Sequence, residues 1–144
     1  TLLPYSVNGM NLHLEIFGNP APQGSKRIIK GRLIEASSEK LRKWRKEIAK
    51  VCTEARARDE ALFFLGPVRV EVVFFMPRPA SVKQSKRPWP IVPPDLDKLC
   101  RGLLDGIGQS EVIWGDDSQV VNLIATKCYA DAREPGASVT ITGI

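Results

Sequence analysis

The chain has few cysteines, one histidine and no long apolar run, and these shortages exclude several classes of protein. Its three cysteines are far apart and form no CxxC pair: Cys52, Cys100 and Cys128. This spacing argues against a disulfide scaffold or a zinc ribbon and favours a reducing compartment such as the cytoplasm. No apolar run approaches the roughly 20 residues of a membrane span, so we expect no membrane partner.

The amino-terminal segment also lacks a secretion signal, because residues 1–9 have neither a charged start nor a long apolar core. Met10 is a candidate start, and residues 1–9 are a candidate non-native or flexible segment. The single histidine, His13, has no histidine or cysteine close to it in the sequence. We therefore expect His13 to have a structural role.

What is present is a basic chain of the size of one domain. Its 144 residues and 43% hydrophobic content are sufficient for a single core. Charged residues make up 26% of the chain, which argues against wholesale disorder. The net charge of +5 and the pI of about 9.3 favour an anionic partner such as nucleic acid.

Hydrophobic periodicity predicts interspersed strands and helices, and hence one α+β domain over residues 1–144 with a mixed sheet and two main helices. Strands are predicted at residues 12–17, 68–76, 112–114, 119–129 and 138–141. Residues 26–36 are either a further strand or an irregular hairpin around Gly31. Apolar residues at steps of three or four predict helices at 38–58 and 95–107.

Residues 77–94 form a proline-rich basic loop that is too long to be a simple connection in a compact domain. The loop holds six of the eleven prolines. Such a loop is either functional or mobile. Trp89 within it either stacks on an unpaired base or packs the loop down.

A second basic region surrounds the start of the first predicted helix, where ten basic residues lie between Lys26 and Lys50. The basic face of that helix is either a solvated surface or a track for phosphates, each contact with which steepens the salt dependence of binding. Candidate DNA contacts in the two basic regions are Lys26, Arg27, Lys30, Arg32, Lys83, Lys86 and Arg87.

The carboxylates are concentrated in one stretch of this otherwise basic chain. Six of the sixteen lie close together in the sequence: Asp95, Asp97, Asp105, Glu111, Asp116 and Asp117. Two like charges about 4 Å apart repel by roughly 4 kcal/mol at an effective dielectric constant near 20, whereas a bound divalent cation converts that repulsion into attraction. An acidic centre in a basic surround suits a protein that cuts a phosphodiester.

Two prolines precede the first of these acids and disfavour a helix before it, so the second helix is predicted to begin at about Asp95. At a helix start Asp95 is still extended and can converge with Asp97, although residues two apart diverge within a helix. A simpler interpretation makes Asp95 an N-cap and Asp97 a first-turn acid. Against it, Lys98 stands where a capping box has Glu or Gln.

The acidic pair Asp116-Asp117 also has a simpler interpretation, because Gly, Asp and Ser are common turn residues. The combination of several features nevertheless favours a functional role for this pair. A helix-start Asp-x-Asp, a basic residue four positions later and an acidic turn ahead of a strand together form one recurring arrangement.

That arrangement resembles the RusA-like family of Holliday junction resolvases, found in phages and prophages. The family pattern is an Asp-hydrophobic-Asp-Asn-Leu helix start, a basic residue on the next turn, an Asp-Ala/Gly near the helix end, and then Trp-x-Asp-Asp-x-Gln-Val. The corresponding residues here are Asp95-Leu96-Asp97-Lys98-Leu99, Arg101, Asp105-Gly106 and Trp114-Gly115-Asp116-Asp117-Ser118-Gln119-Val120. A fainter likeness extends to the amino-terminal strand.

The resemblance implies a dimeric RusA-like fold and a magnesium-dependent endodeoxyribonuclease that resolves four-way DNA junctions by paired symmetric nicks in a bacterial or phage-infected cell. It implies that Asp95, Asp97 and Asp117 are catalytic acids that hold Mg²⁺, for which Mn²⁺ substitutes, without an organic cofactor. Arg101 takes the position of the family's catalytic lysine. Residues expected to support these are Asp116, Asp105 and Lys98.

Two departures from the family pattern leave alternatives open. The usual Asn is Lys98 and the usual Lys is Arg101. Arg101 can clamp a phosphate but cannot lose a proton and act as a base, a role for which Lys98 is the alternative. The competing interpretations are a catalytically weak branched-DNA-binding protein, a sugar transferase that uses Asp-x-Asp, and a purely structural domain. A chain of this length leaves little room for a nucleotide-sugar domain.

Overall fold

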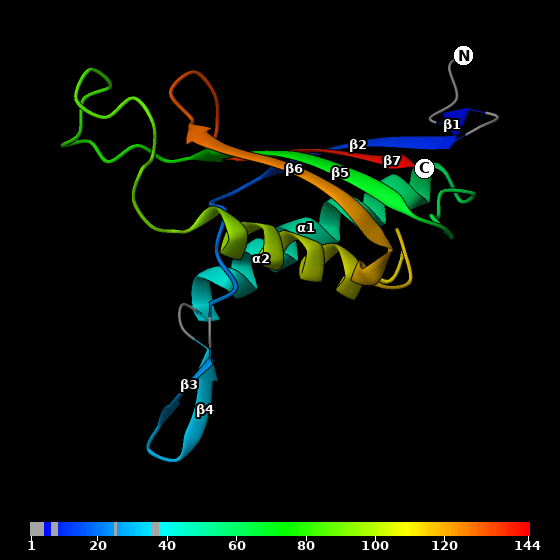
Figure 1. The fold of residues 1–144 in the computed structure, drawn as a ribbon, viewed down its shortest axis with the longest axis horizontal. Helices are drawn as coiled ribbons and strands as arrows, with labels where there is room; N and C mark the ends of the chain where they lie inside the picture. The colour runs from blue at the N-terminus through cyan, green and yellow to red at the C-terminus, as the bar shows by residue number, and fades with distance from the viewer. Residues whose placement is uncertain (1–4, 7–8, 25, 36–37) are drawn as a thin grey trace.

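A computed structural model describes residues 5–6, 9–24, 26–35 and 38–144 of the chain. Two helices lie side by side on one face of a mixed sheet with the strand order β1-β2-β7-β5-β6 (Figure 1). The sheet contains β1 (Tyr5–Ser6), β2 (Gly9–Phe17), β5 (Val68–Met76), β6 (Val120–Tyr129) and β7 (Gly136–Gly143). The helices are α1 (Ser38–Arg58) and α2 (Leu96–Ser110). The predicted α+β class and single domain are therefore confirmed.

The sheet is mixed because one connection crosses over. β7 pairs antiparallel with both β2 and β5, whereas β6 pairs parallel with β5. Parallel neighbours need a long crossover connection, and here it consists of the proline-rich loop, α2 and a single 3₁₀ turn, η1 (Asp117–Gln119). This connection carries all six clustered acids and leaves β6 at the edge of the sheet.

Except for the strand predicted at residues 112–114, the predicted elements are confirmed in their types and differ mainly at their ends. β2 begins before residue 12, and α2 continues to Ser110. The short strand predicted at 112–114 is reduced to an isolated bridge between Phe64 and Trp114. Residues 117–119 form η1, so β6 begins at Val120. Neither helix within the described ranges combines the length and apolar character that crossing a bilayer requires.

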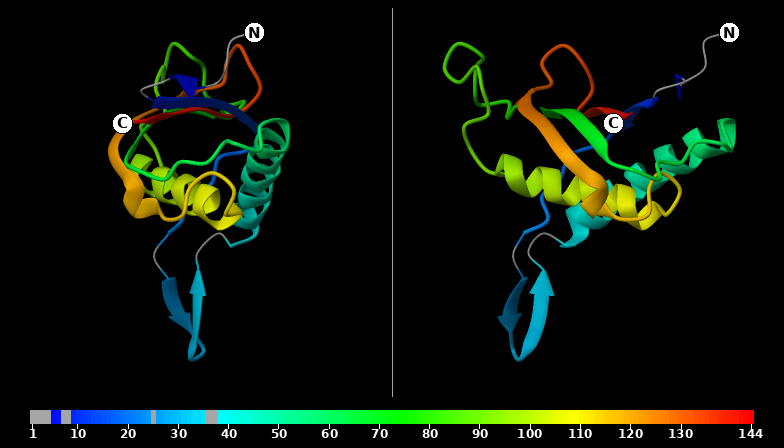
Figure 2. Two further views of the ribbon diagram at one scale, coloured as in Figure 1. Left: turned by 90° about the vertical axis from the view of Figure 1, so that its right-hand side faces the viewer. Right: turned by 45° about the vertical axis from the view of Figure 1, so that its right-hand side comes forward.

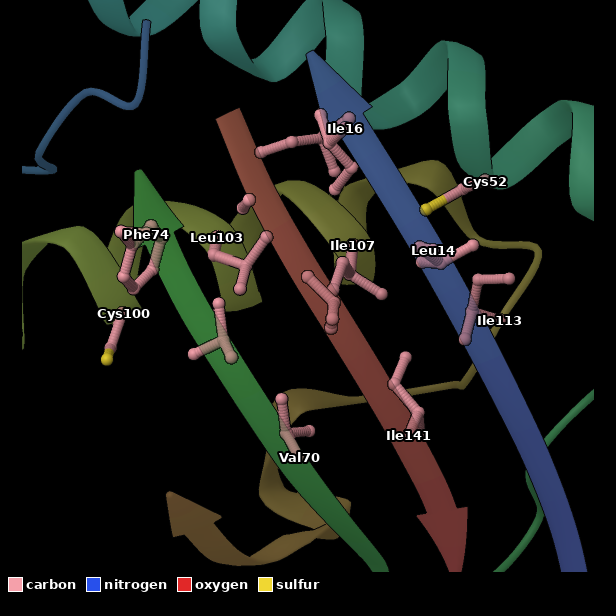
Figure 3. Close-up of a cluster of buried hydrophobic side chains, with 14 of the residues drawn as sticks. Leu14, Ile16, Cys52, Val70, Phe74, Cys100, Leu103, Ile107, Ile113 and Ile141 are labelled. Atoms are coloured by element: carbon pink, nitrogen blue, oxygen red, sulfur yellow. The ribbon is translucent and has the colours of Figure 1, made fainter. Parts of the chain in front are cut away.

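The core lies between the sheet and the helices, where alternate strand residues meet the apolar stripes of α1 and α2 (Figure 3). Phe74 of β5 and Ile141 of β7 point toward Leu103 and Ile107 of α2. All four side chains are fully buried. Burial also raises the pKa of the Cys52 thiol to about 11, so this cysteine is a packing residue.

His13 lies on the opposite face of the sheet, because its neighbours Leu12 and Leu14 point into the core. Its Nε2 is 2.8 Å from the Oε1 of Glu15, and its Nδ1 is 3.1 Å from the Oγ1 of Thr140 on β7. The contact with Thr140 ties β2 to β7, and the contact with Glu15 lies within β2.

Residues 26–35 form a hairpin that projects away from the body of the domain (Figures 1 and 2). Its strands are β3 (Lys26–Ile29) and β4 (Arg32–Glu35), paired antiparallel. The two connecting residues, Lys30 and Gly31, both have positive φ, 52° and 76°. This is the backbone of a tight hairpin turn, in which glycine at the second position avoids strain. The hairpin alternative is therefore the one adopted.

Candidate active site

The first acid of the cluster stands at the start of α2 with its carboxylate free of a capping role. Asp95 is extended (φ −68°, ψ 143°) and makes no side-chain cap hydrogen bond. Its Oδ2 lies 3.8 Å from the Nζ of Lys98, and both groups contact solvent. Asp97 is exposed in the first turn of α2, where its charge adds to burial in raising the pKa of the Cys100 thiol. Both carboxylates are thus available to a ligand.

The last acid stands beyond the other end of α2, in a turn that is held rigidly. The Oε1 of Gln119 accepts hydrogen bonds from the backbone N–H groups of Gly115 and Asp116, at 2.8 and 3.1 Å. Its Nε2 donates to the backbone oxygens of Phe64 and Gly66, at 2.8 and 3.0 Å. The turn that carries Asp117 is therefore fixed to the segment before β5.

Asp117 points back onto α2. The buried Trp114 donates a hydrogen bond from its Nε1 to the Oδ1 of Asp117, over 3.1 Å. A Cβ atom on Gly108 would lie only 2.6 Å from the same Oδ1, so glycine is needed there for the close approach. Trp114 thus has a polar role in addition to its place in the core.

An acidic pocket of about 280 Å³ surrounds this carboxylate, and the acids that line it are Asp105, Glu111, Asp116 and Asp117. Burial raises the pKa of Asp117 to about 6, and a hydrogen bond with Asp105 and the charges of Asp105 and Asp116 act in the same direction. The hydrogen bond from Trp114 opposes the rise. Close carboxylates that share a site disfavour one another's ionisation, and a cation would relieve that repulsion.

The two halves of the expected metal site lie at opposite ends of α2. Asp117 contacts the helix at Gly108, which follows Asp97 by eleven residues. At 1.5 Å per residue this is about 16 Å along the helix axis. One chain therefore unites Asp105, Asp116 and Asp117 but does not bring Asp117 to Asp95 and Asp97. Among the residues that the structure describes, no three carboxylate, histidine or cysteine side chains are grouped closely enough to hold a metal ion.

Arg45 of α1 is a site residue that the sequence did not single out. Its Nη2 lies 3.7 Å from the Oδ2 of Asp105, and it also donates to the Oε1 of Gln23. Gln23 is fixed in turn, because its backbone N–H donates to the oxygen of Lys98 over 3.0 Å. In the sequence Arg45 was one of many cations on the basic helix, and no local signal marked it. Arg101 is exposed one turn after Asp97.

The proline-rich loop is anchored at its base by two cations. Arg78 lies over the ring of Tyr129 at 3.9 Å, pairs with Asp131 at 2.7 Å and donates to the oxygen of Arg87 at 2.7 Å. Lys127 of β6 donates from its Nζ to the oxygens of Val92 and Pro94, at 2.9 and 2.8 Å. Lys127 therefore fixes the segment directly before Asp95.

Removing the Lys127 ammonium is expected to release this segment. A Lys127→Met variant keeps the aliphatic stem but loses both charge-assisted hydrogen bonds, at a local cost of about 1.5 kcal/mol. Trypsin should then cut the loop at Lys83 and Lys86 roughly tenfold faster, because cleavage follows local opening. Lys50→Met, which changes an exposed lysine of α1, is the control. Equal cleavage rates in the two variants would mean that Lys127 does not hold the loop.

The candidate DNA contacts are placed unevenly. Lys30 and Arg32 are exposed at the tip of the projecting hairpin, and Lys83 and Lys86 are exposed in the proline-rich loop. Arg87 instead donates to the Tyr129 hydroxyl over 2.7 Å and is half-buried. The side chains of Lys26 and Arg27 fall outside what the structure describes. Trp89 is 57% exposed and so does not pack the loop down.

Two comparisons with known proteins bear on this arrangement. Residues 18–142 match the family model described as endodeoxyribonuclease RusA. The chain is also 30% identical over 137 residues to the uncharacterized protein YqaN of Bacillus subtilis (strain 168). That alignment covers 88% of this chain and 92% of the relative.

Proposed function

Because the chain belongs to the RusA endodeoxyribonuclease family, we propose that it is a magnesium-dependent nuclease that resolves four-way DNA junctions during recombination and repair. The observation that carries the proposal is the course of β6 beside α2. β6 begins directly after Asp117 and η1, and near its other end Lys127 reaches Pro94, next to Asp95. The strand therefore leads from one half of the acidic site to the other.

β6 is also the edge strand of the sheet and has unusual apolar exposure. Val121, Leu123 and Ile124 are 63%, 41% and 52% exposed. A free edge with apolar side chains is a template for pairing with another strand. We expect a second copy of the chain to cover it, which makes the active form a homodimer.

A two-fold axis through the middle of β6 would set the two β6 strands antiparallel. The start of each strand would then lie beside the end of the other. Asp117 of the partner subunit would approach Asp95 and Asp97, so that each site takes acids from two chains. This arrangement accounts for three acids that a single chain holds apart.

The donor set fits a hard divalent cation, since Asp95, Asp97 and the partner subunit's Asp117 offer only carboxylate oxygens, which suit Mg²⁺ and Mn²⁺. When bound, such an ion supplies Lewis-acid polarisation of a phosphoryl oxygen and activation of water. The negative charges of Asp105 and Asp116 repel the carboxylate of Asp117, and this repulsion favours the binding of a cation by Asp117.

Arg101 has the role of stabilising the charge that develops on the phosphorus during cleavage. It stays protonated and offers a planar fork to two phosphate oxygens. Lys98, whose Nζ is 3.8 Å from the Oδ2 of Asp95, is the alternative candidate for the role of the family's lysine. Cleavage would leave a 5′-phosphate and a 3′-hydroxyl.

The dimer suits the substrate, because a four-way junction has two-fold symmetry and needs two nicks. Two identical sites on a two-fold axis would face symmetric strands. Lys83 and Lys86 of the proline-rich loop, together with Lys30 and Arg32 of the hairpin, would bind phosphates around the crossover. Their contribution should weaken steeply as salt rises.

The direct test is a cleavage assay on a labelled four-way junction and on a linear duplex of the same sequence. We expect paired nicks in the junction with Mg²⁺ or Mn²⁺, none with EDTA, and no cutting of the duplex. Metal-independent cutting would refute the mechanism. Salt-sensitive junction binding without any cutting would instead favour the catalytically weak binding protein, for which the changes at Lys98 and Arg101 are the argument.

A further inference from the structure

A second pocket of about 810 Å³ lies beside the proposed metal site and is lined by none of the acids of that site. It lies between the start of α1, the turn after β2 and the two segments that flank the proline-rich loop. We call it the proline–lysine groove, and the residues that line it are Gly18, Asn19, Pro20, Ala21, Pro22, Lys40, Lys43, Trp44, Lys46, Glu47, Met76, Pro77, Pro93 and Pro94. Its volume is within the range of ligand sites.

One side of the groove is positively charged. Lys40, Lys43 and Lys46 follow one another at steps of three along α1 and are all exposed. None of them belongs to an ion pair among the described residues, and Glu47 is the single acid of the lining. Steps of three place side chains on one face of a helix. The groove therefore presents a short row of free ammonium groups.

The other walls are apolar. Five prolines line the groove, together with Met76 and Trp44, which are only 7% and 1% exposed, so the prolines provide the accessible apolar surface. Proline has no N–H to donate, so the proline walls offer few hydrogen-bond donors that would select one base over another. An apolar wall beside a positive track suits a single-stranded nucleic acid, whose bases and phosphates can contact the two sides without sequence preference.

The walls are also held in place. The backbone N–H of Gly18 donates to the oxygen of Pro135 over 3.0 Å, and Lys127 holds the oxygen of Pro94 at 2.8 Å. A Cβ on Gly102 would lie 2.8 Å from the oxygen of Ala21, so the turn after β2 is pressed directly onto α2. The groove is thus formed before any ligand arrives, and a preformed site loses little entropy on binding.

The groove ends at the proposed site, since Pro94 is followed at once by Asp95. We propose that the groove binds an unpaired stretch of a DNA strand, with bases against the proline walls and phosphates at Lys40, Lys43 and Lys46. This inference rests on the proposed function and narrows its substrate class. The preferred junctions are those with unpaired nucleotides next to the strand that is cut.

The test uses a matched pair of double variants on the same helix. Lys43→Ala with Lys46→Ala removes two charges from the groove, and Arg42→Ala with Lys50→Ala removes two exposed charges outside it. Binding of a fluorescent short oligothymidylate is measured by anisotropy in EDTA. We expect the groove variant to bind about tenfold more weakly, with the slope of log affinity against log salt lower by about 1.4. The control should change less than about twofold.

Four results would overturn the groove assignment. Wild-type protein that fails to bind oligothymidylate would do so, as would equal losses in the two double variants. Equal affinity for an abasic strand of the same length would exclude contact with the bases. Displacement of the strand by a polyglutamate of equal charge, at equal concentration, would identify a general site for acidic chains instead.

The same experiments separate this inference from the proposed nuclease activity. The anisotropy assay contains no metal and needs no cleavage, so strand binding through Lys43 and Lys46 would support the groove even if junctions were never cut. Conversely, metal-dependent nicking of fully paired junctions by protein that ignores oligothymidylate would leave the nuclease in place and refute the groove.

Discussion

Mixing two inactive variants of this chain is expected to restore DNA nicking. Asp95→Asn removes a ligand from the helix start, and Asp117→Asn removes one from the acidic turn. Each homodimer then has two damaged sites and should be inert. In a mixed dimer, one site combines the intact Asp95 of one chain with the intact Asp117 of the other. Random exchange makes about half of the dimers mixed, each with one working site, so about a quarter of wild-type nicking should return.

The control for this experiment lies within the same site. Asp95→Asn mixed with Asp97→Asn damages the same half of the site in both chains, so no site of the mixed dimer is complete. We expect no recovery there. A restored site should also nick one strand of a junction rather than both. The composite site is contradicted if both mixtures recover equally, or if the Asp95 and Asp117 mixture stays inert while sedimentation shows mixed dimers.

Asp117→Asn should abolish cutting and at the same time make the protein more stable. The neutral amide keeps an oxygen for Trp114 and offers Asp105 a donor in place of a repelling charge. Because water still reaches this half-buried group and screens the repulsion, we expect a gain of only about 1 kcal/mol at pH 8. For a chain of this size that raises Tm by roughly 2–4 °C, measurable by calorimetry without metal.

The pH dependence of this gain in stability follows from the direction in which the pKa of Asp117 is shifted. The pKa of Asp117 rises from 3.8 to about 6, so the folded state holds this proton more tightly than the unfolded state. The contribution of Asp117 to the free energy of unfolding of the wild type is fully present below pH 3.8 and is lost as the pH rises through 6. The advantage of Asp117→Asn should therefore be complete above pH 6 and vanish below pH 4. Glu111→Gln, at the exposed rim of the pocket, is the control. If the gain in stability of Asp117→Asn did not depend on pH, an effect of the Asp117 charge would be excluded.

The fold was predictable wherever one face of an element is buried. β5 alternates buried and half-exposed residues along nearly its whole length, and α1 has a regular apolar stripe. The region around Gly31 stayed ambiguous because its apolar residues come in adjacent pairs, Ile28-Ile29 and Leu33-Ile34, which follow neither the strand period nor the helix period. The bridge at Trp114 was mistaken for a strand because Val112–Trp114 is apolar without having a neighbour to pair with along its length.

The sequence singled out the acids of the candidate site, but their arrangement in space could not be predicted from it. The spacing of Asp95 and Asp97 after two prolines correctly indicated an extended residue followed by a helix. The contact between Asp105 and Asp117 depends on the parallel pairing of β6 with β5, which folds the turn back onto α2. The role of Lys127 could not be predicted, because its hydrogen-bond partners are backbone oxygens, which are the same for every residue type.

The length of α2 has a consequence for when the protein can act. A newly synthesised chain carries both halves of a site but holds them apart by several helical turns. Under the composite arrangement a solitary chain is harmless to the genome that encodes it. Nicking then appears only after two chains have met, so at low expression it should increase with the square of protein concentration. In that arrangement the length of the helix would set a concentration threshold and would keep stray breaks rare until enough protein has accumulated to act on both strands together.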